Sequence, residues 1–317
     1  MKNEKMRVII DTDPGVDDAM AILMILAAPN IEVLAITTVA GNSTIENVSK
    51  NAKYILDIAG RSDIPIYVGG ACPLKKQLIT ADVHGQTGLG NIDLSKMDGA
   101  TSEISASEKL AELIESNPDQ ITILALGPLT NIAMVLLSNK DLQNKVMQLV
   151  MMGGAIDVPG NKSAFAEFNF FVDPEAAKIV FESNLPKALV PLDLCNQVIM
   201  QESDIAKLGE GKVAKFLRSI LTPYALNIGK LEGLNGAVMY DPLAAYYLTD
   251  EAAFTTREMS IRIQAEGELS AGMSVADKSS LPTWTPNVRV AMSVDQDKFI
   301  QDVYTAIKKL DSNIKSE

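Results

Sequence analysis

Short apolar runs and amphipathic helical patterns alternate along most of this chain. Arg7–Asp11 has the length and composition of a buried strand, and Asp17–Ala28 follows as a helix with few polar positions. The pair repeats as a strand over Val33–Val39 and a helix over Thr44–Ala59, in which apolar residues return at helical spacing. Because parallel strands need crossover connections, this alternation predicts an α/β fold whose parallel sheet is covered by helices on both faces.

The same two patterns continue toward the C-terminus, with more helix in the second half. The further strands that we expect are Ile64–Val68, Ile121–Leu126, Val146–Met152 and Ala188–Leu192. The further helices that we expect are Ser107–Glu115, Leu129–Leu137, Pro174–Glu182, Glu202–Leu208, Val213–Leu226, Pro242–Leu248 and Gln296–Leu310. Ser260–Ile263 and Val288–Ser293 are expected as edge strands. Since no linker or repeat divides the sequence, we expect one domain over residues 1–317.

Composition and charge exclude several classes of protein. With 47% apolar residues the chain can bury a large core, so general disorder is excluded. The net charge of −12 argues against a protein that follows nucleic-acid phosphates, which needs a basic surface. The two cysteines, Cys72 and Cys195, indicate ordinary thiols in a reducing compartment. No apolar run has the length of a signal-peptide core or a membrane span, so we expect a cytoplasmic protein with no nucleic-acid or membrane partner.

The densest chemical signal follows the first expected strand. Residues 11–18 read Asp-Thr-Asp-Pro-Gly-Val-Asp-Asp and place four carboxylates within eight residues. Such carboxylates repel one another unless a cation binds or protons neutralise them. Capping of the following helix and a tight Pro-Gly turn explain one or two of these aspartates and leave the others unexplained. Because carboxylate oxygens suit hard cations and the chain has a single histidine, we expect Ca²⁺ or Mg²⁺ here rather than Zn²⁺.

Polar and glycine-containing segments also follow the later strands, at the edge of the sheet where ligands bind in open α/β folds. These segments are Gly41-Asn42, Gly127–Asn131, Gly153-Gly154 and Asp193. Two long segments rich in glycine and polar residues, 69–101 and 153–173, are candidate binding loops. His84 lies in the first of them, and two alternatives stay open for it: a structural or exposed residue, or a proton donor or ligand contact.

The second of these loops contains polar residues that helix capping does not explain. Asp173 stands directly before a proline and fits an N-cap. Upstream of it, Asn161, Glu167 and Asn169 have no such role in the pattern and would suit a polyhydroxylated ligand. Asp241 also stands directly before a proline, so the sequence pattern alone favours capping for this residue.

Taken together, these segments resemble the nucleoside hydrolases of the inosine–uridine-preferring type. The resemblance begins with residues 11–19, Asp-Thr-Asp-Pro-Gly-Val-Asp-Asp-Ala, and continues in order over essentially the whole chain. The other segments that carry it are Ile36–Asn42, His84–Gly88, Gly127–Asn131, Met151–Gly154, Ala166–Asn169, Asp173–Ala177 and Asp241-Pro242. The combination of these motifs is highly specific.

The resemblance implies a Rossmann-like single domain, with an open and mostly parallel sheet between two layers of helices, and a tightly bound Ca²⁺. The metal ligands that it implies are Asp13, Asp18, the backbone carbonyl of Thr130, and Asp241. The residues that match ribose-binding positions of the family are Asp17, Asn42, Met152 through its backbone, Asn161, Glu167 and Asn169. Asp13 is also the implied general base, acting on a Ca²⁺-bound water. The implied assembly is a homodimer or homotetramer.

The sequence departs from the family at the end of the site that faces the leaving base. Many members carry a histidine directly before the last metal-binding aspartate, where it acts as an acid, and this chain has Tyr240 there. A phenol stays neutral near pH 7 and donates a hydrogen bond, but it matches a neutral-pH proton shuttle poorly. His84 is the alternative acid, unless the base leaves with help from hydrogen bonding or stacking. The segment Leu226–Gly236 lacks the expected aromatic and Arg residues, which leaves Tyr224.

Three hypotheses for the function follow, and we favour them in the order given. The first is a Ca²⁺-dependent N-ribohydrolase that cleaves a nucleoside into ribose and base. The second is a catalytically weak or inactive nucleoside or ribose sensor, with the chemistry lost through Tyr240. The third is a phosphatase that uses Asp11 and Asp13 as nucleophile and acid, although Gly15 stands where such an enzyme would have Thr.

Overall fold

An eight-stranded sheet forms the centre of the computed structural model, which describes residues 5–314. The strands lie in the order β3-β2-β1-β4-β5-β6-β12-β9. Their bounds are β1 Met6–Thr12, β2 Ile31–Thr38, β3 Ile66–Val68, β4 Ile121–Ala125, β5 Val146–Met152, β6 Lys187–Val190, β12 Val288–Val294 and β9 Phe254–Met259. Neighbouring strands are parallel except β12 and β9, which are antiparallel. The predicted open, mostly parallel sheet is therefore confirmed.

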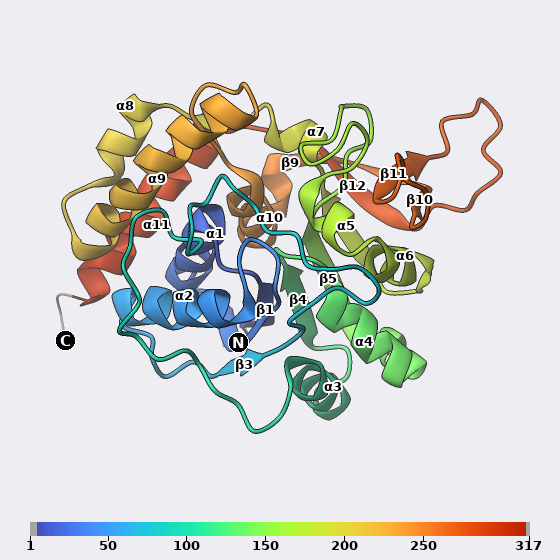
Figure 1. Cartoon of the computed structure of the whole chain (residues 1–317), viewed down its shortest axis with the longest axis horizontal. Helices are drawn as coiled ribbons and strands as arrows, with labels where there is room; N and C mark the ends of the chain where they lie inside the picture. Colours follow the sequence, from blue (N-terminus) through green and yellow to red (C-terminus); the bar gives the residue numbers. More distant parts are fainter. Residues whose placement is uncertain (1–4, 315–317) are drawn as a thin grey trace.

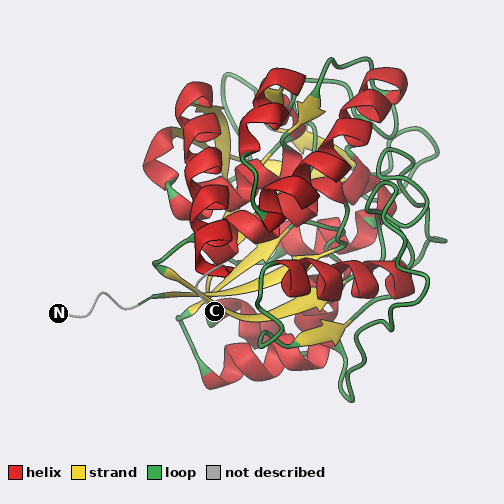
Figure 2. Ribbon diagram, turned by 90° about the vertical axis from the view of Figure 1, so that its left-hand side faces the viewer, coloured by secondary structure: helices red, strands yellow, loops and turns green. Residues whose placement is uncertain are grey.

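Helices cover both faces of this sheet (Figure 1), and Figure 2 shows the strands between helices above and below them. The helices are α1 Val16–Ala27, α2 Ile45–Ile58, α3 Ala106–Ser116, α4 Thr130–Ser138, α5 Phe168–Val172, α6 Pro174–Glu182, α7 Leu192–Cys195, α8 Glu202–Ile205, α9 Lys212–Leu231, α10 Tyr240–Thr249 and α11 Gln296–Ile314. Val8 and Ile10 of β1 pack in one apolar cluster with α1, α2, α9, α10 and α11. Ile9 packs in a second cluster with α3, α4 and α6, because side chains alternate along a strand.

The expected edge strands near the C-terminus differ from the structure. β12 is an internal strand, which pairs with β6 on one side and with β9 on the other. The edge strand is β9, which the sequence analysis missed because only Phe254 and Met259 at its two ends are buried. The expected strand at 260–263 is β10, Ile261–Gln264, and it pairs with β11, Met273–Ala276, in a separate two-stranded sheet. A third small sheet joins β7, Ile199–Met200, to β8, Ala237–Val238.

The direction in which strands are added to the sheet reverses at β1. β2 and β3 lie on one side of β1, and β4 with the later strands lies on the other. In open α/β sheets, ligands bind outside the carboxyl ends of the strands at such a switch point. Asp13 follows β1 directly, so the acidic turn lies at this position.

Two further expectations concern the extent of the chain and the membrane. The expected domain of residues 1–317 includes 1–4 and 315–317, which lie outside the described residues. Among the helices of residues 5–314, none is long and apolar enough to cross a membrane.

Candidate active site

The acidic turn between β1 and α1 is held by hydrogen bonds to its own carboxylates. The chain turns at Pro14 and Gly15, and α1 begins at Val16. Asp18 accepts a hydrogen bond from the backbone N–H of Gly15 at 2.8 Å and another from the Thr12 hydroxyl at 2.5 Å. Asp18 therefore helps to cap α1, as the sequence pattern allowed for one or two of the four aspartates.

Asp13 occupies a narrow space between the loops that follow β2 and β4. It is fully buried, and its Oδ2 accepts a hydrogen bond from the backbone N–H of Asn42 at 2.6 Å. A Cβ atom on Gly41 would lie 2.1 Å from Asp13 Oδ2, and one on Gly127 would lie 2.5 Å from Oδ1. Glycine is therefore required at both positions, because any side chain there would displace the Asp13 carboxylate.

Three carboxylates form a compact buried cluster with the composition of a metal site. Asp17, Asp18 and Asp241 each offer an oxygen, and these oxygens lie within 4.8 Å of one another. Burial raises the pKa of each carboxyl group, and the charges of Asp17 and Asp18 raise the pKa of Asp241 further. Asp17 Oδ1 is buried without a hydrogen-bond partner among the described residues, and so is Asp13 Oδ1. Buried oxygens with raised pKa values and no donor fit a bound divalent cation, which would compensate the clustered charge.

The cluster differs in two respects from the expectations for individual residues. Asp241 does not cap α10: the helix begins at Tyr240, its N-cap position is Met239, and no side chain caps it. The capping interpretation of Asp241 is therefore wrong, because the carboxyl group lies in the cluster with Asp17 and Asp18 instead. Asp17, which matches a ribose-binding position, belongs to the compact cluster, whereas Asp13 is not one of its three members.

Thr130 and Asp173 form a supporting contact next to the site. Thr130 is the first residue of α4, and its hydroxyl donates to Asp173 Oδ2 at 2.7 Å. Asp173 Oδ1 accepts from the backbone N–H of Ala176 at 3.0 Å, so its predicted role as the N-cap of α6 is confirmed. The role of the Thr130 carbonyl as a metal ligand stays a prediction.

A cavity of about 280 Å³ brings together residues from both candidate binding loops and from the strand ends. Nine of the residues singled out in the sequence line it: Asp17, Asn42, His84, Met152, Asn161, Glu167, Asn169, Tyr240 and Asp241. Further lining residues were not singled out, among them Phe168, Leu231 and Glu232. The cavity is therefore polar where the carboxylates and amides meet and partly apolar around the remaining residues.

The polar residues of the second loop are fixed by contacts with the backbone. Glu167 accepts hydrogen bonds from the backbone N–H groups of Gly154, Asn169 and Phe170, and burial raises its pKa to about 7. It is the N-cap of α5, so the expectation that capping does not account for Glu167 is wrong. The Asn169 amide donates to the carbonyls of Leu126 at 2.8 Å and Met152 at 3.3 Å. Asn161 Oδ1 accepts from the Phe168 N–H at 2.9 Å.

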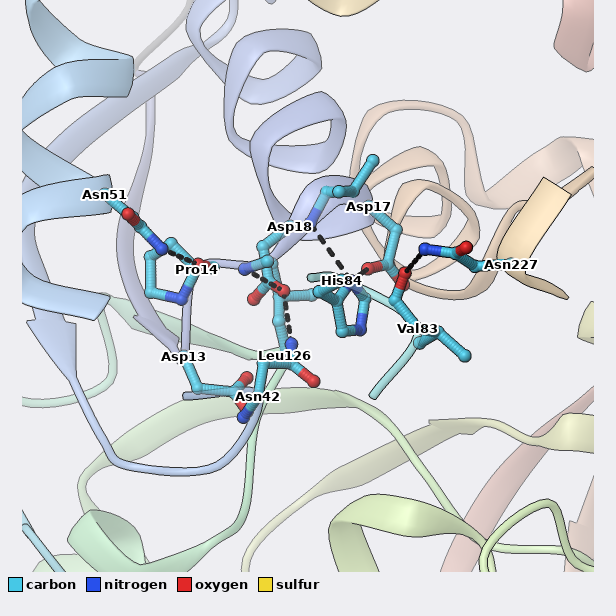
Figure 3. Close-up of polar contacts among 12 residues, drawn as sticks. Asp13, Pro14, Asp17, Asp18, Asn42, Asn51, Val83, His84, Leu126 and Asn227 are labelled. Carbon is cyan, nitrogen blue, oxygen red and sulfur yellow. Dashed lines mark hydrogen bonds and ion pairs between the residues drawn. The ribbon is translucent and has the colours of Figure 1, made fainter. Parts of the chain in front are cut away.

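His84 is buried against the first turn of α1, as Figure 3 shows. Its Nδ1 accepts a hydrogen bond from the backbone N–H of Val16 at 3.2 Å and lies 3.7 Å from Asp17 Oδ1. Its ring stacks on Tyr224 with centroids 5.3 Å apart and an angle of 16° between the planes. Since Nδ1 is an acceptor, the neutral ring carries its proton on Nε2. Burial lowers the pKa of His84 to about 3, which favours this neutral form.

We expect the His84 ring to stay neutral between pH 5 and 8 in the folded protein. A lowered pKa means that the ring takes up a proton only in acid, well below the ordinary value of about 6.5. NMR of the ring resonances measures this directly, because the chain contains one histidine. The unfolded protein serves as the control and should titrate near the ordinary value. A midpoint close to 6.5 in the folded protein would contradict the assignment.

Tyr240 forms a short hydrogen bond with a residue that the sequence analysis did not single out. Its hydroxyl donates to Glu232 Oε2 at 2.5 Å, and both residues line the cavity. Glu232 directly follows α9, which extends to Leu231, beyond the predicted end at Leu226. Burial raises the pKa of Glu232, and burial together with the Glu232 charge raises the pKa of Tyr240. The signal in the sequence is that Glu232 is the one acidic residue of Leu226–Gly236, the segment that lacks the expected aromatic and Arg residues.

Comparisons with known proteins agree with this fold. Residues 8–301 match the family model of the inosine-uridine preferring nucleoside hydrolases. The chain is 38% identical over 297 residues to the pyrimidine-specific ribonucleoside hydrolase RihA of Shewanella sp. (strain MR-7), which covers 92% of this chain and 93% of that protein. The structure of the plant nucleoside hydrolase PpNRh1 superposes with a TM-score of 0.90 at 33% identity, covering 95% of this chain and 98% of that chain. The purine-preferring ribonucleoside hydrolase from Gardnerella vaginalis superposes with a TM-score of 0.89 at 27% identity, covering 97% and 99% of the two chains.

The open α/β sheet, the buried carboxylates at its switch point and these matches define an N-ribohydrolase, an enzyme that hydrolyses ribonucleosides. The chain belongs to the inosine-uridine preferring nucleoside hydrolase family, as the match over residues 8–301 shows. The first of the three hypotheses is therefore correct at the level of family and reaction.

Proposed function

We propose that this chain hydrolyses ribonucleosides with the help of Ca²⁺, and that Asp13 is the general base. The observation that carries the proposal is the buried group of carboxylates with oxygens that lack a donor, next to a cavity lined by further carboxylates and amides. Ca²⁺ takes six to eight oxygen ligands from carboxylates, carbonyls and hydroxyls. Asp13, Asp18, the Thr130 carbonyl and Asp241 would hold it, with Asp17 close by.

Asp13 has the environment that a general base requires. Its Oδ2 is held by the Asn42 N–H, while its Oδ1 lacks a donor and keeps lone pairs for a proton. Burial and the charge of Asp18 raise its pKa, so the carboxylate binds a proton more readily than an exposed aspartate does. When bound, Ca²⁺ would orient the attacking water and lower its pKa. Asp13 would take a proton from that water as the water attacks C1′ of the ribose.

The remaining polar residues of the cavity would recognise the sugar. Asp17, Asn42, Asn161, Glu167, Asn169 and the Met152 carbonyl are the proposed ribose contacts. As the bond from C1′ to the base breaks, its electron pair goes to the base and positive charge develops on the ribosyl group. The nearby carboxylates and amides would stabilise this charge, and they are held in place by hydrogen bonds to the backbone and to one another before substrate arrives.

The proposal extends to the state of the protein in the cell. A cytoplasmic homodimer or homotetramer that acts on small nucleosides, without nucleic-acid or membrane partners, remains our prediction. Light scattering of the purified protein measures the mass of the assembly.

The test is an assay of ribose release from inosine, uridine, adenosine and cytidine, together with elemental analysis of the purified protein. We expect release from at least one nucleoside, stoichiometric Ca²⁺, and loss of activity on treatment with a chelator that is restored by Ca²⁺. Bound nucleoside without ribose release would favour the sensor hypothesis instead. Full activity in a protein shown to be free of metal would refute the Ca²⁺ dependence.

A further inference from the structure

Glu232 is a carboxyl group of the cavity that the proposed mechanism leaves without a role. Its Oε2 accepts the Tyr240 hydroxyl at 2.5 Å. No hydrogen bond or ion pair within residues 5–314 reaches its other oxygen, Oε1, and no Lys or Arg of that range pairs with the group. A cavity-lining carboxyl group held through one oxygen leaves the other oxygen available to a ligand.

The other polar groups near Glu232 are less suited to release a proton. The His84 ring is neutral, accepts the Val16 N–H through Nδ1 and stacks on Tyr224, so its Nε2–H can donate a hydrogen bond but gives up its proton much less readily than a carboxyl group does. The Tyr240 hydroxyl gives its one proton to Glu232. The Lys162 ammonium group donates to the Thr80 carbonyl at 3.4 Å and lies 5.7 Å from the centre of the Phe168 ring. Glu232 is thus the group of this set with an oxygen free to act on a bound molecule.

We propose that Glu232, oriented by Tyr240, protonates the departing base. This role rests on the proposed nucleoside hydrolysis. The bond between C1′ and the base breaks with its electron pair going to the base, and the Glu232 carboxyl group supplies the proton that the base takes up. Water supplies the hydroxyl group at C1′, and its remaining proton goes to Asp13. The products are ribose and neutral base, and the proton on Asp13 and the charge on Glu232 are reset by exchange with solvent.

The surroundings of Glu232 support a carboxyl group that keeps its proton until the base leaves. Burial raises its pKa, and the hydrogen bond from Tyr240 opposes this effect in part. The Tyr240 phenol is less suited, because its own pKa is raised and it releases its proton less readily. Tyr240 is therefore a positioning residue in this proposal, and Glu232 is the acid.

The test compares two ribosides whose leaving groups differ in their need for a proton. A nucleoside base needs one, whereas p-nitrophenolate leaves p-nitrophenyl β-D-ribofuranoside without one. In Glu232→Gln we expect kcat/KM to fall about 100-fold on the best nucleoside, the range of general acid catalysis, and less than about threefold on the p-nitrophenyl riboside. In Tyr240→Phe we expect the same selectivity with a loss of about tenfold, since the acid is retained but less well oriented.

Glu251→Gln is the matched control. Glu251 also accepts a tyrosine hydroxyl, from Tyr247 of α10 at 2.9 Å, and it does not line the cavity. This variant should hydrolyse both ribosides at the wild-type rate.

Three outcomes would overturn the proposal. Equal losses on both ribosides in Glu232→Gln would assign Glu232 to sugar binding or folding, and unchanged rates on both would remove it from the reaction. If Glu232→Gln does not fold, an equal loss on both ribosides in Tyr240→Phe would exclude the proposed roles of Glu232 as acid and Tyr240 as positioning residue. A wild-type protein that cleaves neither riboside would overturn the proposed function itself. This result is distinguishable from the other outcomes, because each of those compares a variant with an active wild type.

Discussion

In the Asp13→Asn protein, ribose release is expected to fall by about 10³-fold or more while the fold stays intact, because general base catalysis is worth about 10² to 10⁴ in rate. Asparagine has nearly the same shape as aspartate, so it fits between Gly41 and Gly127 and still accepts the Asn42 N–H through its side-chain oxygen. What it lacks is the second carboxylate oxygen, Oδ1, which has no donor and is proposed to take the proton from water. Steady-state assays, with circular dichroism for the fold, measure both effects.

Asp11→Asn is the matched control for this experiment. Asp11 lies two residues earlier, is also fully buried, and burial raises its pKa to about 6. Its Oδ1 accepts hydrogen bonds from Thr37 at 2.6 Å and Asn131 at 2.8 Å, so it supports the strand ends. We expect a loss of less than about tenfold. A loss as large as that of Asp13→Asn would mean that disturbing the buried strand end is enough to abolish activity, and a small loss in Asp13→Asn would refute its role as base.

Local sequence patterns predicted a cation site at the acidic turn, but they led to one interpretation, helix capping, for two aspartates that differ in the structure. Asp173 and Asp241 each precede a proline, and Asp173 is the N-cap of its helix. Asp241 is not, because α10 begins one residue earlier, at Tyr240. The difference arises from Asp17 and Asp18, more than 200 residues earlier in the chain, which no pattern around Asp241 contains. Only the resemblance to a family assigned Asp241 to the metal site.

Strand β9 and Glu232 show the same dependence on distant partners. The four central residues of β9 are exposed, so its sequence lacks the alternation of apolar and polar residues that predicts a strand. It forms by pairing with β12, and this pairing turns the predicted edge strand into an internal one. Glu232 meets Tyr240 across the connection between α9 and α10, where no helical or strand period relates the two residues.

The Asp241→Asn protein is expected to be more stable than the wild type without metal and less stable with it. Burial and the charges of Asp17 and Asp18 raise the pKa of Asp241 in the folded state above its value of about 3.9 in the unfolded chain. Proton binding by this group therefore stabilises the folded protein fully below about pH 4, and the stabilisation is lost as the pH rises through the raised pKa. At higher pH the ionised Asp241 adds a buried negative charge that destabilises the folded protein. A neutral amide lacks this charge, so the metal-free variant should melt at least about 2 °C higher at pH 8, with a smaller difference at pH 5.

Calcium should reverse the order, because a ligand that binds only the folded state stabilises it, and a tighter ligand stabilises it more. The wild type keeps the full set of proposed ligands and should gain the larger increase in melting temperature, whereas Asp241→Asn should gain little and release no ribose. Asp11→Asn serves as the control, since its carboxyl group is buried outside the cluster and the full calcium effect should remain. Melting curves at several calcium concentrations and at both pH values measure the effect. If calcium raised the melting temperatures of the wild type and Asp241→Asn equally, Asp241 would not be a ligand. If the metal-free wild type were as stable as the variant at pH 8, the clustered charges would not destabilise the folded protein. Such a reversal would show that the same carboxylates cause both effects. Their clustered charge destabilises the metal-free protein, and their binding of a cation stabilises the protein with calcium.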